Sequence, residues 1–165
     1  MNKAVLLDRD GVLNRERDDY TFRIQDFEIL PDVIEALKLL RKKGYLLIII
    51  SNQGGIGRNI FKIADTEKMH AHFLKILAKE KIKIEEIYYC VHHPETGSCI
   101  CRKPDSLMVE KTLARFNIDP KLSYFIGDKE RDVLAGEKAG VKGILIKSNS
   151  SLLKAIQPCV KKGKN

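Results

Sequence analysis

The sequence predicts an α/β fold: a doubly wound, mostly parallel, Rossmann-like sheet with helices on both faces. Short apolar runs of strand length alternate along the chain with segments whose apolar residues recur at helical spacing, which is typical of consecutive strand–helix–strand units. Several of the apolar runs also stop abruptly at polar residues, as expected where parallel strands end at a shared ligand-binding edge.

The chain opens with the first of these units. Residues 4–7 form a short apolar run that we interpret as a buried strand. Residues 31–43 are predicted as a helix because apolar side chains recur every three or four positions, and Gly44 follows as a stop signal. Residues 45–50 are apolar throughout and form the second predicted strand.

The next unit runs from residue 65 to residue 89. A helix is predicted over 65–79, because Met69, Phe73 and Leu77 recur on one face. The apolar and aromatic run at 84–89 is the third predicted strand.

The last two strands follow the same pattern. Helices are predicted over 106–116 and 131–139, the second of which is followed by Gly140 as a helix stop. The apolar runs at 124–126 and 143–146 complete a sheet of five strands.

Length and composition indicate one domain. The chain has 165 residues, 44% of them hydrophobic, which is enough to form a substantial core. We expect a single domain over 1–157 and a basic, poorly ordered tail over 158–165, where apolar periodicity is lost. The longest apolar stretch is far shorter than the roughly 20 residues that span a bilayer. We therefore expect a soluble, cytoplasmic protein without a membrane partner. Our expectation for its oligomeric state is a monomer.

The chain carries a formal net charge of +8, which suits an anionic substrate. Its lysines are dispersed, as on a solvated surface, and no nucleic-acid recognition motif accompanies them. A small anionic molecule is therefore the expected partner, and a nucleic acid is not.

Two acids, Asp8 and Asp10, follow the first predicted strand, with one residue between them. Asp8 is our candidate nucleophile, because a carboxylate can attack phosphorus and form an aspartyl-phosphate. Asp10 is the candidate general acid and base, and Gly11 gives the backbone freedom to turn it toward the same site. An ordinary Asx turn at the end of the strand is the alternative interpretation.

A third acid, Asp128, follows the fourth predicted strand and can join Asp8 in holding a hard cation. We expect catalytic Mg²⁺ at this position and count Asp10 as the third residue of its site. Asp132 has two open interpretations, as support for the metal shell or as a first-turn acid that complements the helix dipole.

Other polar side chains complete a phosphoryl-transfer site. Ser51 offers a hydroxyl to a phosphoryl oxygen, and Lys103 offers a compact positive charge, to which Lys129 adds a second. Arg102 can clamp a further anionic group through its planar guanidinium, with a surface ion pair as the alternative.

A cluster of thiols and one imidazole lies within twelve residues, a spacing that favours a closed, structural Zn²⁺ site over free cysteines. Its expected ligands are Cys90, His92, Cys99 and Cys101. The neighbouring His93 is expected to be a partly exposed loop residue. The remaining candidates, interpreted as structural or surface residues, are Cys159, His70 and His72.

The order of these motifs resembles the haloacid-dehalogenase superfamily of phosphatases over nearly the full length of the chain. Within it, the chain is similar to the D-glycero-D-manno-heptose 1,7-bisphosphate phosphatase family, with the histidinol-phosphatase domain as a near relative. The segments that carry the resemblance are DRDGVLN, SNQGGIGR, YYCVHHP, CICRKP and GDKERD.

The resemblance implies a haloacid-dehalogenase-type fold without a cap domain and an open active site. It implies Mg²⁺-dependent hydrolysis of a heptose 1,7-bisphosphate to a heptose 1-phosphate through an aspartyl-phosphate. By the same resemblance, the substrate is bound by Asp19, Tyr20, Asn52, Gln53, Gly54, Arg102 and Lys129.

Three other functions remain open at this point. The first is hydrolysis of histidinol phosphate, which shares the zinc loop and the order of catalytic residues. The second is a polynucleotide 3′-phosphatase, which suits the basic charge. The third is a zinc-stabilised binding module without catalysis, which the complete set of acids, hydroxyl and lysine argues against.

Overall fold

The computed structural model describes residues 1–161, which contain a five-stranded sheet with only parallel neighbours. The strands are β1 (Lys3–Leu7), β2 (Tyr45–Asn52), β3 (Glu86–Cys90), β4 (Tyr124–Gly127) and β5 (Lys142–Leu145). Their order across the sheet is β3-β2-β1-β4-β5. The predicted α/β fold with a parallel sheet is therefore confirmed.

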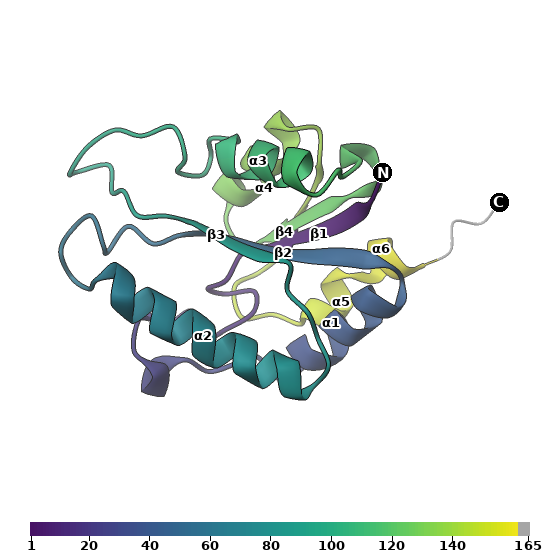
Figure 1. The fold of residues 1–165 in the computed structure, drawn as a ribbon, viewed down its shortest axis with the longest axis horizontal. Coiled ribbons are helices and arrows are strands. Elements are labelled where there is room, and N and C mark those ends of the chain that lie inside the picture. Colours follow the sequence, from purple (N-terminus) through teal and green to yellow (C-terminus); the bar gives the residue numbers. More distant parts are fainter. Residues whose placement is uncertain (162–165) are drawn as a thin grey trace.

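Helices cover both faces of this sheet (Figure 1). The α-helices are α1 (Val33–Lys42), α2 (Ile63–Lys79), α3 (Leu107–Arg115), α4 (Glu130–Lys138), α5 (Leu152–Ala155) and α6 (Gln157–Val160). Helices α1, α2, α5 and α6 lie on one face, and α3 and α4 lie on the other. Two short 3-10 helices are also present, η1 (Ile24–Asp26) and η2 (Pro120–Leu122).

Alternate residues of the central strands enter two separate cores. In β1, Val5 and Leu7 pack in the core beneath α1 and α2, whereas Leu6 packs in the core beneath α3 and α4. The side chains of β2 alternate in the same way. Because successive side chains of a strand point to opposite faces, a strand buried on both faces is apolar at every position. This geometry explains the unbroken apolar runs in the sequence.

The order of the strands in the sheet determines where a ligand site can form. The chain builds outward from β1 through β2 to β3, and then returns to place β4 on the other side of β1. The direction in which strands are added therefore reverses between β1 and β4. In such sheets, ligands usually bind in the crevice at the carboxyl ends of the two strands at this point. Asp8 directly follows β1 and Asp128 directly follows β4, so the two acids meet at that crevice.

The structure extends the ordered region beyond the predicted domain boundary. Residues 158–160, which the sequence assigns to a poorly ordered tail, belong to α6, and the side chain of Cys159 is buried in the core beneath α1. That part of the prediction is wrong, because one buried side chain anchors a segment too short to show periodicity. Residues 162–165 of the predicted tail lie outside the described residues.

The predicted start of α2 also differs. The apolar pattern predicts Asp65 as the first helical residue, but the helix begins at Ile63. The Asp65 carboxylate accepts a hydrogen bond from the backbone N–H of Lys62 at 2.8 Å, so Asp65 is the third residue of the helix and caps its first turn.

Within residues 1–161 there is no cap domain. The interval after β1 holds η1 and α1, and the interval after β2 holds α2, β3 and the cysteine-containing loop. Over the same residues, the helices are too short or too polar for any of them to cross a membrane.

Candidate active site

The segment that follows β1 turns sharply, which brings both acids to the crevice. The backbone N–H of Asp8 donates to the carbonyl of Ile126 in β4 at 3.0 Å, which continues the sheet pairing by one residue. Gly11 then adopts a φ of +84°, and a Cβ atom at this position would lie only 2.4 Å from the Asp128 carboxylate. A glycine is therefore required both for the turn and for the close approach of the first loop to Asp128.

Asp8 belongs to a buried group of three charges. The Lys103 ammonium lies 2.8 Å from the Asp8 carboxylate and 2.7 Å from that of Asp132, and it also donates to the carbonyl of Ile50 at 2.7 Å. Asp132 in addition accepts the backbone N–H of Lys129 at 3.0 Å, which caps α4. Asp132 therefore serves both as a first-turn acid and as a partner of the site lysine.

Burial raises the pKa of Asp8 to about 7, against the opposing attraction of Lys103. The neighbouring Asp132 adds to the increase, since it shares the same lysine. For Lys103, burial acts to lower the pKa, but the two carboxylates outweigh it and the pKa is raised. The lysine is therefore held in its charged form next to the candidate nucleophile.

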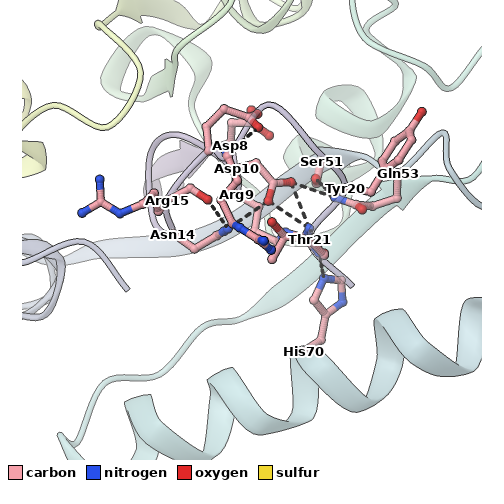
Figure 2. Close-up of polar contacts among 12 residues, drawn as sticks. Asp8, Arg9, Asp10, Asn14, Arg15, Tyr20, Thr21, Ser51, Gln53 and His70 are labelled. Carbon is pink, nitrogen blue, oxygen red and sulfur yellow. Dashed lines mark hydrogen bonds and ion pairs between the residues drawn. The ribbon is translucent and has the colours of Figure 1, made fainter. Parts of the chain in front are cut away.

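Asp10 has a separate set of partners (Figure 2). One carboxylate oxygen accepts hydrogen bonds from Arg9 Nη2 at 3.0 Å and Asn14 Nδ2 at 2.9 Å, and the other accepts from Gln53 Nε2 at 3.1 Å. Burial acts to raise the pKa of Asp10, but Arg9 and the hydrogen bonds lower it overall. The same Gln53 nitrogen donates to the hydroxyl of Ser51 at 2.8 Å. Gln53 therefore links the acid pair to the segment at the end of β2.

The structure brings together carboxylates that fit a cation. Among the described residues, the oxygens of Asp8, Asp128 and Asp132 lie within 4.8 Å of one another. Asp128 Oδ1 is buried and has no hydrogen-bond partner among them, as expected of a metal ligand, while its other oxygen accepts from the hydroxyl of Ser148. The Asp10 carboxylate is engaged by Arg9, Asn14 and Gln53, and the place of Asp10 in the metal site stays a prediction.

The cysteine cluster has the geometry of a tetrahedral metal site. Sulfur ligands about 2.3 Å from Zn²⁺ in a tetrahedron lie about 3.8 Å apart. Cys90 Sγ lies 3.2 Å from Cys101 Sγ and 3.6 Å from Cys99 Sγ, and His92 Nδ1 lies 3.4 Å from Cys90 Sγ. All four predicted ligand atoms lie within 4.8 Å of one another. The cysteines are free thiols, so the four residues could hold a zinc ion.

This cluster leads directly into the active-site lysine. Arg102 donates from Nη1 to the carbonyl of His92 at 2.9 Å, which ties the two sides of the loop together. The backbone of Lys103 is held on both sides by the amide of Asn52, which donates to its carbonyl at 3.1 Å and accepts its N–H at 3.0 Å. The loop is therefore anchored to β2 where Lys103 enters the core.

A cavity of about 390 Å³ opens above these groups. Both acids of the pair and Asp128 line it, together with all seven predicted substrate-binding residues, Asp19, Tyr20, Asn52, Gln53, Gly54, Arg102 and Lys129. Ser51 and Lys103 are each 1% exposed and lie against cavity-lining residues, Ser51 against Gln53 and Lys103 against Asp8. Five further residues line the cavity and were not predicted to bind substrate: Glu16, Asp18, Thr21, His93 and Arg131.

Two residues of the acid network were missed by sequence reasoning although a signal was present. Arg9 and Asn14 lie inside the first motif, and charged or amide side chains directly beside an acid pair are candidates for its partners. Two others, His70 and Ser148, carry no such signal. They reach the site from α2 and from the segment after β5, and only the fold brings them close.

Comparisons with known proteins agree with this geometry. A family described as HAD-hydrolase-like matches residues 100–159. The chain is 40% identical to the D-glycero-beta-D-manno-heptose-1,7-bisphosphate 7-phosphatase of Haemophilus ducreyi, over 91% of this chain and 86% of that protein. It is 42% identical to the D-glycero-alpha-D-manno-heptose-1,7-bisphosphate 7-phosphatase of Campylobacter jejuni, over 87% of this chain and 81% of that protein.

A solved structure has the same fold. The D,D-heptose 1,7-bisphosphate phosphatase of B. bronchiseptica, complexed with magnesium and phosphate, superposes with a TM-score of 0.83 and 28% identity. The match covers 94% of this chain and 86% of the other.

Proposed function

The chain belongs to the family of D-glycero-D-manno-heptose-1,7-bisphosphate 7-phosphatases, and from this premise we propose that it releases the phosphate at position 7 of such a sugar and leaves a heptose 1-phosphate. The observation that carries the proposal is the position of Asp8. Its carboxylate lines the cavity, and the Lys103 ammonium lies against it on the buried side. This is the arrangement needed for attack on a phosphorus atom bound in the cavity.

In the first step, an Asp8 oxygen forms a bond to phosphorus while the bond from phosphorus to the sugar oxygen breaks. Asp10 gives a proton to the leaving oxygen, so the sugar departs as an alcohol. In the second step, Asp10 takes a proton from water, the water oxygen bonds to phosphorus, and the bond to Asp8 breaks. Inorganic phosphate leaves and both acids return to their starting state.

The electrostatics of Asp10 suit this double role. In the resting site its lowered pKa favours the ionised form, which can accept a proton from water. A phosphate dianion bound beside it opposes that ionisation, because like charges raise the pKa of a carboxyl group. Substrate binding therefore favours the protonated form that the first step requires.

We propose Mg²⁺ as the catalytic cofactor, held by Asp8 and Asp128 with Asp10 as the third residue of the site. The unpaired, buried Asp128 oxygen supports this assignment, as does the magnesium in the B. bronchiseptica relative. When bound, Mg²⁺ supplies positive charge that offsets the repulsion between the Asp8 carboxylate and the phosphoryl oxygens. Asp132, engaged by Lys103, orients that lysine toward Asp8.

We also propose a structural Zn²⁺ held by the cluster of three cysteines and His92. A closed set of four protein ligands has no open position for chemistry, so its contribution is to stabilise the loop that carries Arg102 and Lys103. A reducing cytoplasm, in which the thiols stay available for the metal, is the location that we propose for the protein, as a monomer.

Arg102 is the proposed contact for the second phosphate of the substrate. It lines the cavity and is partly buried, and its bond to the carbonyl of His92 leaves other guanidinium nitrogens available. Without a cap domain, selectivity has to come from such contacts to the remote end of the substrate.

A substrate panel tests the proposal. The chain is incubated with Mg²⁺ and either anomer of the heptose 1,7-bisphosphate, histidinol phosphate, other sugar phosphates or an aryl phosphate, and phosphate release is measured. We expect the highest kcat/KM with a heptose bisphosphate and a product that keeps one phosphate, checked by ³¹P NMR. A higher kcat/KM with histidinol phosphate would identify the chain as that enzyme instead. No hydrolysis of any substrate would support a binding module.

A further inference from the structure

A histidine from α2 lies close to the acid pair but does not line the cavity. His70 is 5% exposed, and its Nε2 lies 3.3 Å from Nη1 of Arg9 (Figure 2). It comes from a helix that contributes no other group to the network, 61 positions away in the sequence. From the sequence we interpret His70 as a structural or surface residue, but in the structure its Nε2 contacts the active-site Arg9.

Arg9 is the link between His70 and Asp10. Its side chain is 1% exposed, so its guanidinium can be held only by protein groups. Nη2 donates to Asp10 and to the carbonyl of Thr21 at 2.8 Å, and Nη1 faces His70. The Arg9 guanidinium therefore connects His70 of α2 to Asp10, the proposed general acid and base.

The chemistry of arginine defines the state of the histidine. A guanidinium group can only donate hydrogen bonds, so His70 Nε2 has to be the acceptor. The ring is therefore neutral and carries its proton on Nδ1. Burial and the nearby Arg9 charge lower the pKa of His70 to about 4, against a smaller opposing effect of Asp10, in agreement with a neutral ring.

The other groups around His70 do not offer Nε2 a competing partner. The ring of Tyr89 in β3 packs edge-on, with centroids 5.3 Å apart, and its hydroxyl donates to Glu67 of α2. His70 and Tyr89 line a second pocket, separate from the active-site cavity. Two further acids of that pocket, Glu85 and Glu86, pair with Arg41 and Arg115, respectively.

We propose that His70 is a positioning residue for catalysis: by accepting from Nη1 it sets the plane of the Arg9 guanidinium and so holds the Asp10 carboxylate in the orientation for proton transfer. The inference rests on the proposed phosphatase function. In the described part of the chain, the cavity lining includes Asp10 and Thr21 but neither Arg9 nor His70, so His70 acts through another residue and does not contact substrate.

The tautomer of His70 is tested on the wild-type protein with Mg²⁺ present and requires no substrate. Long-range ¹H–¹⁵N correlation spectra of the histidine-labelled protein near neutral pH should show a neutral His70 ring protonated at Nδ1. A ring protonated at Nε2, or at both nitrogens, would overturn the proposal.

Matched substitutions test the positioning role. In His70→Leu, the side chain fills similar space but cannot accept a hydrogen bond. We expect kcat to fall about tenfold to a hundredfold, as for a misplaced catalytic group, with KM within about twofold of wild type. In His70→Gln, the side-chain oxygen can reach the position of Nε2, so most of kcat should return. The control is His72→Leu, the same substitution two residues away on α2, which should keep kcat unchanged.

These outcomes separate a positioning role from simple packing. If His70→Leu keeps wild-type kcat, or His70→Gln is as slow as His70→Leu, the proposal is wrong. If His70→Leu does not fold, the tautomer measurement and the His70→Gln kinetics still decide. If the wild type hydrolyses no sugar bisphosphate but His70 is protonated at Nδ1, the proposed function fails while the geometry of the network stands.

Discussion

The Lys103 ammonium group lies 2.8 Å from the Asp8 carboxylate, although 95 positions separate the two residues in the sequence. The same ammonium lies 2.7 Å from Asp132, so one buried cation serves two buried acids. These three charges come from the end of β1, the loop after the cysteine cluster and the first turn of α4. The candidate active site is therefore also part of the structural core, and its charges affect both turnover and stability.

Replacing Lys103 with methionine should destabilise the protein. The substitution leaves Asp8 and Asp132 buried without their cation, and removal of one partner from a buried charge group costs about 3 to 5 kcal/mol. We expect a decrease of this size in the free energy of unfolding, measured by urea denaturation, together with loss of turnover. Lys111→Met, on the exposed surface of α3, is the control and should leave stability within about 0.5 kcal/mol. Equal stability of the two variants would show that Lys103 does not neutralise the acids.

Replacing Asp8 with asparagine should abolish turnover and preserve the fold. Asparagine is a poor nucleophile, so we expect kcat to fall by at least about 10⁴-fold. The cost in stability should be small, because burial already raises the pKa of Asp8 to about 7 and the neutral form is well tolerated. Phosphate release and thermal melting measure the two effects. Asp105→Asn, an exposed acid outside the cavity, serves as the control, and retained turnover in Asp8→Asn would refute the nucleophile assignment.

Magnesium affinity should depend on pH through Asp8. Because its pKa in the folded, metal-free protein is about 7, above its ordinary value of 3.8, the folded state binds this proton more tightly than the unfolded state does. The contribution of Asp8 to the free energy of unfolding therefore decreases as the pH rises from about 4 to about 7.

Because Mg²⁺ binds the ionised carboxylate, its affinity should rise up to about tenfold per pH unit below pH 7 and level off above it. Calorimetric titration with Mg²⁺ at several pH values measures this dependence. In Asp8→Asn the slope should disappear. A wild-type affinity that stays constant between about pH 5.5 and pH 7 would contradict the prediction.

Removing a cysteine of the cluster should release zinc and destabilise the loop. We expect wild type to contain about one zinc per chain and Cys101→Ser to contain less, with a melting temperature lower by about 10 °C. Activity should fall as well, because Lys103 follows two residues later. Metal analysis by mass spectrometry and thermal melting provide the readouts. Cys159→Ala, which changes the cysteine outside the cluster, should retain its zinc, and equal zinc content in both variants would exclude the assigned ligands.

Arg102 should distinguish a bisphosphate from a monophosphate. In Arg102→Met, we expect KM for the heptose bisphosphate to rise about tenfold or more, since a charge-assisted contact to phosphate is lost. KM for a sugar monophosphate should change much less. Steady-state kinetics with both substrates make the comparison, and Arg115→Met on the exposed surface of α3 is the control. A proportional increase in both KM values would assign Arg102 to the scissile phosphate rather than to the remote one.

Much of the fold follows from local pattern. The nine predicted strands and helices are all present, with every end within two residues of its predicted position, because a continuous apolar run and a helical repeat both appear within a short window of sequence. The short helices α5 and α6 were not predicted, since four residues are too few to show a repeat.

The candidate site likewise contains residues that can be selected from local sequence and contacts that cannot. The acid pair, Asp128 and the proposed zinc ligands could be selected from the sequence because their chemistry is expressed in residue type and close spacing. The partners of the Asp10 carboxylate could not be predicted in this way, because Gln53 reaches it from the end of another strand.

The order of strands and helices, the acids and the cysteine–histidine cluster can therefore be identified from the amino-acid sequence, because each depends on neighbours a few positions apart. The sharing of Lys103 between Asp132 and Asp8, and the contact of His70 with Arg9, arise from the folded chain. These contacts depend on β4 lying beside β1 and on α2 packing beneath the first loop. Long-range packing of this kind has no signature in local periodicity.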